Sequence, residues 1–154
     1  KEYFHVYKGL KKWHTELGDQ VLRRGFVQTP SGRQFAFPGA KRTRSGRVTN
    51  HTQLVNFPVQ SFATADQVPL ACVRALRKFR ELKLKSKLVL TVHDSIVVDI
   101  HPDELDAVNQ ALKWAMTGVT DEMKDRFNYE AVLPLDIEGS VGPNWMDQTE
   151  LSVD

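Results

Sequence analysis

The residues best suited to chemistry stand between two apolar runs near the middle of the chain. Leu88–Val92 and Ile96–Ile100 flank the triplet His93-Asp94-Ser95. Runs this close together can pair only as antiparallel strands, because a parallel pair needs a long crossover. A carboxylate on the tip of such a hairpin could hold Mg²⁺, which prefers hard oxygen ligands. Asp94 is therefore a candidate metal ligand.

Asp94 also has a purely structural interpretation. Aspartate is common in turns because its side chain bonds to nearby backbone amides. Two-metal phosphoryl transfer requires at least two carboxylates. Asp99 and Asp136 lie on predicted strands, and neither is an obvious second ligand. The local sequence leaves both interpretations of Asp94 open.

The surrounding sequence predicts the elements that position this triplet. Apolar periodicity and turn residues predict a helix over 2–24, a hairpin over 26–37, a basic loop over 39–50, a helix over 57–83, a hairpin over 88–100, a helix over 103–117 and a strand over 133–138. Pro69 is expected to interrupt the long helix, and residues 120–130 are expected to form a helix extension or a loop. This order predicts an α+β fold, with helices packed on one face of a small antiparallel sheet.

The composition is that of an ordered globular domain. The chain has 154 residues, of which 41% are hydrophobic and 26% charged. A single cysteine, Cys72, excludes an internal disulfide, and no apolar run is long enough to span a membrane. Basic residues crowd positions 41–47 and 74–87, which favours a phosphate-rich partner, although either cluster alone could be a solvated face. The start at Lys1 without methionine indicates a processed, split or truncated product.

Four segments, taken in order, resemble the C-terminal part of the palm in family A DNA polymerases. The hairpin at 32–38 resembles the family's G-R-x-x-x-x-P motif, and residues 56–66 read NFPVQSFATAD, which resembles N-x-P-x-Q-G-T-A-A-D. Residues 92–95, VHDS, resemble the third palm motif, V-H-D-E. Residues 133–138, LPLDIE, with 142–145, GPNW, resemble the closing V-P-L-x-V-E and G-x-N-W. The resemblance covers nearly the whole chain.

The resemblance implies a role for each matching residue. Asp94 matches a metal-binding carboxylate of the palm, and His93 would lie beside the primer terminus. Asn56 and Gln60 match residues that touch paired bases in the minor groove. The further residues expected to contact DNA are Arg33, Lys41, Arg42 and Arg44. Without the resemblance, helix capping and solvent exposure would be the preferred interpretation of Asn56 and Gln60.

The resemblance also implies cofactors, partners and location. The cofactor would be Mg²⁺ in a two-metal site, with one carboxylate supplied from outside this chain. The partners would be primer–template DNA, deoxynucleoside triphosphates and the N-terminal remainder of the polymerase, which carries the first palm motif and the fingers helix. Without that remainder, an exposed apolar patch is expected. The expected location is the cytoplasm of a bacterial or phage-infected cell.

The sequence departs from the family pattern at several positions, which leaves two alternatives. Ser95 stands where the family usually has glutamate, and serine there also occurs in single-subunit RNA polymerases. Ser61 replaces a usual glycine, and Thr52 replaces a common arginine. The alternatives are a non-catalytic nucleic-acid-binding module derived from a palm and a fragment of an RNA polymerase. An acidic palm motif and a fingers helix upstream would identify a polymerase.

Overall fold

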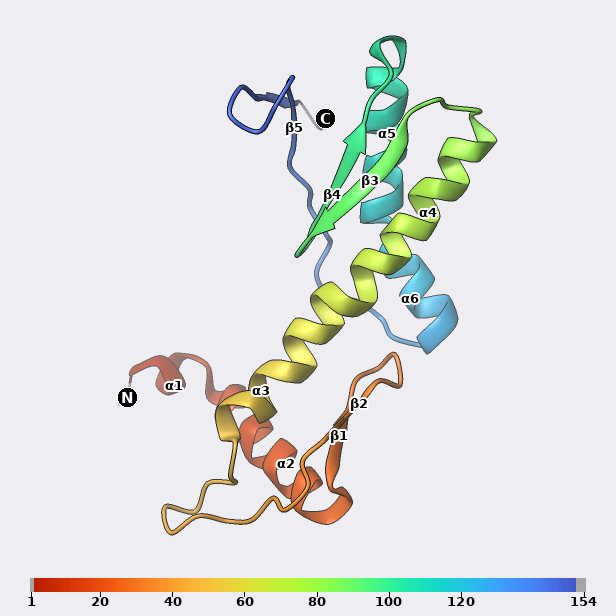
Figure 1. Cartoon of the computed structure of the whole chain (residues 1–154). Helices are drawn as coiled ribbons and strands as arrows, with labels where there is room; N and C mark the ends of the chain where they lie inside the picture. Colours follow the sequence, from red (N-terminus) through yellow and green to blue (C-terminus); the bar gives the residue numbers. More distant parts are fainter. Residues whose placement is uncertain (1, 152–154) are drawn as a thin grey trace. The chain divides into compact units, whose positions relative to one another are not determined.

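The computed structural model describes residues 2–151 and divides the chain into two compact units, with the boundary between Ala63 and Thr64. The elements of the first unit are α1 (Glu2–Val6), α2 (Lys8–Arg24), β1 (Phe26–Gln28), β2 (Gln34–Ala36) and α3 (His51–Gln60). A π-helical segment, η1 (Ser61–Asp66), follows α3 directly and crosses the boundary. Figure 1 shows all these elements along the chain.

The second unit contains the candidate metal ligand. Its elements are α4 (Gln67–Glu81), β3 (Lys87–Val92), β4 (Ser95–Asp99), η2 (Pro102–Glu104), α5 (Leu105–Thr117), α6 (Val119–Phe127), β5 (Gly139–Val141) and β6 (Thr149–Leu151). Within residues 2–151, the strands form three antiparallel two-stranded sheets, β1–β2, β3–β4 and β5–β6. Helices mixed with small antiparallel sheets confirm the α+β class.

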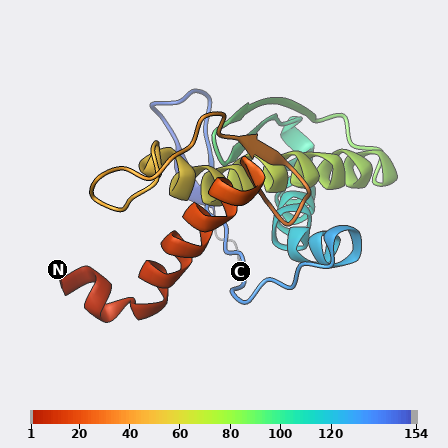
Figure 2. The same cartoon turned by 90° about the horizontal axis from the view of Figure 1, so that it is seen from below.

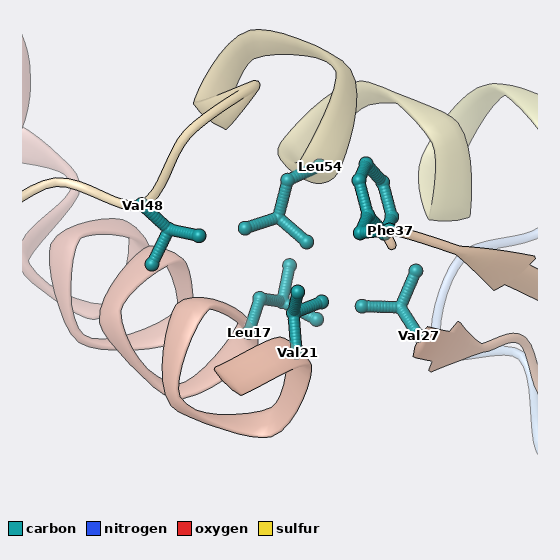
Figure 3. Close-up of a cluster of buried hydrophobic side chains, with 6 residues drawn as sticks. All are labelled: Leu17, Val21, Val27, Phe37, Val48 and Leu54. Atoms are coloured by element: carbon teal, nitrogen blue, oxygen red, sulfur yellow. The ribbon is translucent and has the colours of Figure 1, made fainter. Parts of the chain in front are cut away.

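The core of the first unit lies between α2, the β1–β2 hairpin and α3 (Figure 3). Six buried side chains meet there: Leu17, Val21, Val27, Phe37, Val48 and Leu54. The helix α2 ends at Gly25, whose φ of +76° suits glycine and whose N–H donates to the carbonyl of Val21. This stop turns the chain directly into β1, so that Val27 enters the same core.

The predicted single helix over 2–24 is wrong, because two helices, α1 and α2, form there and Tyr7 between them is not helical. Figure 2 shows the bend between the two helices near the N-terminus. Tyr7 has φ −99° and ψ 67°, outside the helical region. The apolar step from Phe4 to Leu10 spans six residues, which does not return to the same face of one continuous helix. The rings of Tyr3 and Tyr7 instead lie 5.0 Å apart.

The predicted helix over 57–83 begins earlier than expected. Helical structure starts at His51 and continues through η1 to Glu81. The first turn of α3 is polar and only Leu54 of this helix is buried, so apolar periodicity gave no signal there. The expected interruption at Pro69 is wrong, because the helix continues through this residue, although a π-helical segment over Ser61–Asp66 precedes it. Pro69 itself lies in the first turn of α4, where a missing amide donor removes little.

The core of the second unit joins α4 and α5 to one face of the β3–β4 sheet. Phe79, Val108 and Ala111 are buried, and Leu88 and Val98 pack against them. The pairing register shifts between Leu88 and Leu90, so Val89 is left over as a bulge. Val89 and Leu90 are 57% and 53% exposed, which confirms that apolar surface is left uncovered on β3.

Arg74 ties the three helices of this unit together. From α4, its Nε donates to the carbonyl of Ala115 at 3.1 Å and its Nη1 to Glu122 at 3.2 Å. The guanidinium also lies 4.2 Å from the ring centroid of Trp114. At Gly118, between α5 and α6, an added Cβ would stand 2.2 Å from an Arg74 nitrogen. The glycine therefore leaves the space that the arginine fills.

The predicted strand over 133–138 is wrong. No strand is assigned there, and the neighbouring short strand β5 begins at Gly139. Pro134 has no amide donor for a sheet, and within residues 2–151 this segment has no strand partner. Val132 and Leu133 are accordingly 91% and 77% exposed.

Candidate functional site

His93 and Asp94 form the tip of the β3–β4 hairpin. Val92 pairs with Ser95, which leaves only these two residues in the loop and confirms the predicted antiparallel pairing. The hydroxyl of Ser95 donates to the carbonyl of Val92 at 2.7 Å and closes the turn. Both tip side chains are exposed.

The backbone at the tip is strained. His93 has φ +55°, in the left-handed region that glycine adopts freely. For other residues this conformation costs roughly 1–2 kcal/mol, although histidine occurs there more often than most. Glycine would satisfy the turn better, so the turn alone gives no reason for histidine at this position.

The carboxylate of Asp94 makes no hydrogen bond or ion pair with any residue in the described range 2–151. The turn is closed by Ser95 instead, so the interpretation of Asp94 as a turn-supporting side chain is wrong. The described residues contain no group of three or more metal-ligating side chains that could hold an ion. Among these residues Asp94 is an exposed carboxylate, and it would fit a Mg²⁺ site only together with further ligands.

The loop that leads into β3 is fixed by Glu104 of η2. Its carboxylate accepts hydrogen bonds from the backbone N–H groups of Lys85 and Ser86, each at 2.9 Å, and from the Ser86 hydroxyl at 2.7 Å. The hydroxyl oxygen of Ser86 accepts in turn from the N–H of His101. These bonds favour the charged carboxylate and lower the pKa of Glu104 to about 2, against the opposing effect of burial. The start of β3 is thus held to the start of α5.

Asn56 and Gln60 are four residues apart on α3 and lie on the same side of the helix. Both are exposed. The N-cap of α3 is Asn50, so the helix-capping interpretation of Asn56 is wrong. Two amide side chains at this spacing can donate to and accept from a partner along the helix.

Two turns of the first unit share the motif T-x-S-G-R, at 29–33 and 43–47. In the first, the Thr29 hydroxyl bonds to Ser31 at 2.7 Å and the N–H of Thr29 donates to the carbonyl of Arg33 at 2.9 Å. Thr43 makes the same bonds to Ser45 and to Arg47, at 2.9 Å and 2.7 Å. This repeat was not predicted, although the five-residue match is present in the sequence. Each turn ends on an exposed arginine, Arg33 or Arg47.

The predicted basic loop over 39–50 is confirmed and is more ordered than its composition suggests. Arg42 and Val48 form an isolated bridge, and Lys41 and Thr49 are also joined by backbone hydrogen bonding. Arg42 forms an ion pair with Asp19 and donates to the carbonyl of Gly46 at 3.1 Å. Lys41 and Arg44 are exposed. Arg42 therefore has a structural role in addition to any contact with a partner.

The predicted site residues fall into two groups. The two amides, Arg33 and the basic loop belong to the first unit, whereas His93 and Asp94 belong to the second. Within the first unit, the basic loop leads directly into the helix that carries the amides. Within the second, histidine and carboxylate are brought together on one hairpin tip. No helix among residues 2–151 combines the length and apolar character needed to cross a membrane.

Comparison with known proteins shows that the chain is similar to DNA polymerase I from several bacteria. The chain is 27% identical over 150 residues to DNA polymerase I of Chloroflexus aurantiacus and 30% identical over 151 residues to the thermostable DNA polymerase I of Thermus thermophilus. These alignments cover 97% of this chain but only 15% and 17% of the relatives, so the chain spans about a sixth of their length.

A solved structure shows the same fold. It is the POL domain of Pol1 from M. smegmatis in complex with DNA primer-template and dNTP, with a TM-score of 0.72 and 23% identity over 87% of this chain and 22% of that one. The family model described as DNA polymerase family A matches residues 1–147. The chain therefore belongs to DNA polymerase family A.

Proposed function

We propose that this chain forms the C-terminal part of a polymerase palm and takes part in template-directed DNA synthesis. The observation that carries the proposal is the Asp94 carboxylate, exposed on a strained hairpin tip and bonded to none of the residues 2–151. Membership of the family supports the reaction class, and the bacterial relatives support the expected cytoplasmic location.

In this proposal each side chain has a defined task. Asp94 would supply one carboxylate to Mg²⁺, which when bound would stabilise negative charge on the transferred phosphoryl group. His93 would contact the primer terminus beside it. Asn56 and Gln60 would hold the terminal base pairs through the minor groove, where amides reach acceptors that all correct pairs share. Arg33, Lys41, Arg42 and Arg44 would bind backbone phosphates.

Primer extension tests the proposal. The 154-residue chain alone should not incorporate nucleotides, because residues 2–151 contain no group of three or more metal-ligating side chains and the reaction needs a site with at least two carboxylates. Combined with the remainder of its polymerase, it should extend a primer with deoxynucleotides. Extension by the isolated chain would contradict the need for a remainder, and no extension by the combination would contradict the proposed function.

Two alternative functions can be tested in the same assay, a non-catalytic DNA-binding module and a fragment of an RNA polymerase. The first alternative is a non-catalytic DNA-binding module, supported by the exposed basic residues Lys41 and Arg44, which would bind primer–template without extending it in any combination. Ser95 favours an RNA polymerase fragment, for which ribonucleotides would replace deoxynucleotides as substrates. Comparing both nucleotide sets in one extension assay separates the three functions.

A further inference from the structure

A pocket of about 430 Å³ lies wholly within the first unit, and neither Asn56 nor Gln60 lines it. Its walls come from α1, α2, the second T-x-S-G-R turn and the start of α3. Five of the lining side chains are basic: Lys11, His14, Arg42, Arg47 and His51. The lining residues include no aspartate or glutamate. A concave site with this charge distribution attracts anions.

The packing of the first unit fixes the walls of this pocket against one another. Gly18 of α2 lies so close to the turn that an added Cβ would stand 3.0 Å from Val48. Val48 is buried in the core, so the turn is anchored on α2. Arg47 is positioned by its own turn, because its carbonyl accepts from both the N–H and the hydroxyl of Thr43. The backbone of Arg47 is therefore held by its turn, which reduces the entropy lost on binding.

The charged groups of the pocket are only partly compensated. Arg42 is paired with Asp19. Within the described range 2–151, the side chains of Lys11 and Arg47 have no hydrogen bond or ion pair. The helix α3 begins here without a side-chain cap, which leaves first-turn N–H groups available at the pocket. Lys11 and Arg47 thus line the pocket together with the first residue of a helix that no side chain caps.

We propose that this pocket binds a phosphate-type oxyanion, held by Lys11 and Arg47 with help from His51 and the start of α3. The anion would be a free phosphate or a phosphate of the nucleic-acid backbone, since the same donors recognise both. The binding does not depend on polymerase activity, so it can be tested separately from the proposed function.

The imidazole of His51 makes the binding sensitive to pH. Burial, then the neighbouring His14, then Arg47 lower the pKa of His51, which favours its neutral form in the empty pocket. The charged or titratable groups that line the pocket with it are Lys11 and His14 from α2 and Arg42 and Arg47 from the turn, all basic, and Asp19 is paired with Arg42. An anion favours the protonated imidazole and raises its pKa again. Binding therefore takes up a proton, and affinity rises as the pH falls toward 6.

The test is a sulfate titration of the complete chain by NMR, following the ring signals of His14 and His51. Sulfate keeps its charge over this pH range, so any pH dependence belongs to the protein. We expect saturable binding, with Lys11→Gln and Arg47→Gln each weakening it roughly tenfold. His51→Gln should flatten the pH dependence. Thermal unfolding of each variant verifies that the fold is kept.

Matched controls remove the same charge outside the pocket. Lys8 and Arg24 lie on α2 but do not line it, so Lys8→Gln and Arg24→Gln should leave sulfate binding unchanged. Binding that never saturates, or equal weakening by controls and pocket variants, would overturn the proposal. A single-stranded oligonucleotide that displaces sulfate identifies nucleic acid as the source of the phosphate. Displacement by inorganic phosphate but not by the oligonucleotide identifies a free anion.

Discussion

Asp94 can be changed without touching the packing of the molecule, because it is exposed and bonded to no described residue. In a polymerase that contains this chain, Asp94→Asn keeps the size of the side chain and removes the charge that Mg²⁺ requires. We expect nucleotide incorporation to fall at least a thousandfold, about 4 kcal/mol in activation free energy. Single-turnover extension and primer–template affinity measure the two effects, and the affinity should stay nearly constant.

Asp99→Asn is the matched control, because Asp99 is an exposed carboxylate on the same hairpin. It should extend primers at the wild-type rate. Near-normal turnover by the Asp94 variant would show that this carboxylate holds no catalytic metal.

At the residue scale, the position of the β3–β4 hairpin tip could be predicted from the sequence, but the role of Asp94 could be predicted only in part. The two apolar runs placed His93 and Asp94 in a turn, because runs so close can only fold back on each other. The sequence could not separate a turn-supporting aspartate from a free one, since that depends on which neighbour closes the turn. Ser95 closes it, and this contact became visible only in three dimensions.

Among the elements, the connection between η2 and the start of β3 depends on a charged side chain. The pKa of Glu104 is about 2 in the folded chain and 4.5 in a model peptide. A lowered pKa means that Glu104 stabilises the fold fully above its unfolded value and that this contribution is lost as the pH falls from about 4.5 to about 2. Glu104→Gln should lower the Tm at pH 7 and remove this part of the acid destabilisation.

The measurement is Tm against pH for the wild type, Glu104→Gln and the control Asp106→Asn. Asp106 is an exposed acid in the first turn of α5. Its variant should follow the wild-type acid profile. A Glu104→Gln profile parallel to that of the wild type would mean that other carboxylates set the acid sensitivity.

Arg74 makes a second prediction at this scale. Its side chain is 12% exposed and contacts α5 and α6 from α4. Arg74→Met keeps much of the aliphatic stem but loses the charged hydrogen bonds, which should lower the free energy of unfolding by about 2 kcal/mol. Urea denaturation measures this loss. Arg77→Met, at an exposed position of the same helix, should change stability by less than about 0.5 kcal/mol.

The predicted helices and strands were wrong where a segment has few buried apolar residues or where its structure depends on a partner distant in the sequence. The start of α3 is polar, so periodicity could not show it before Leu54. Leu133 and Leu135 alternate as in a strand, but an alternating pattern forms a strand only where a partner pairs with it. Hairpins and the helix at 105–117 were placed well, because their signals are local.

For the whole molecule, a salt series should distinguish residues that set the affinity for primer–template from residues that position the primer end. Lys41→Gln and Arg44→Gln should each reduce the slope of log affinity for primer–template against log salt by about one, with little effect on turnover at saturating DNA. Asn56→Ala and Gln60→Ala should leave this slope unchanged and slow single-turnover extension, by up to roughly a hundredfold, because a small misplacement of the primer end is costly.

The experiment is a salt series of binding and extension for both sets in the complete polymerase. Arg42→Gln is an internal comparison and should lower stability as well, since Arg42 is paired with Asp19. Amide variants that lose binding but keep turnover would contradict the minor-groove assignment.

At this scale, the order of four motifs was enough to predict the family, which the match over residues 1–147 confirms. The basic pocket could not be predicted, because its walls come from separate segments. Lys11 and His14 belong to α2, whereas Arg47 and His51 follow much later in the chain. The close approach of Val48 to Gly18 and the ion pair between Arg42 and Asp19 bring these segments together.

The hydrogen bonds to the carboxylate of Glu104 also allow local opening of the loop before β3 to be measured. The amide protons of Lys85 and Ser86 are both donated to this one group, at the entrance to β3. Hydrogen exchange of these two amides should therefore be slow and should accelerate together whenever Glu104 is protonated or its loop opens. Two exchange rates, read at successive pH values, would follow local opening next to the hairpin that carries Asp94, without any label or substitution.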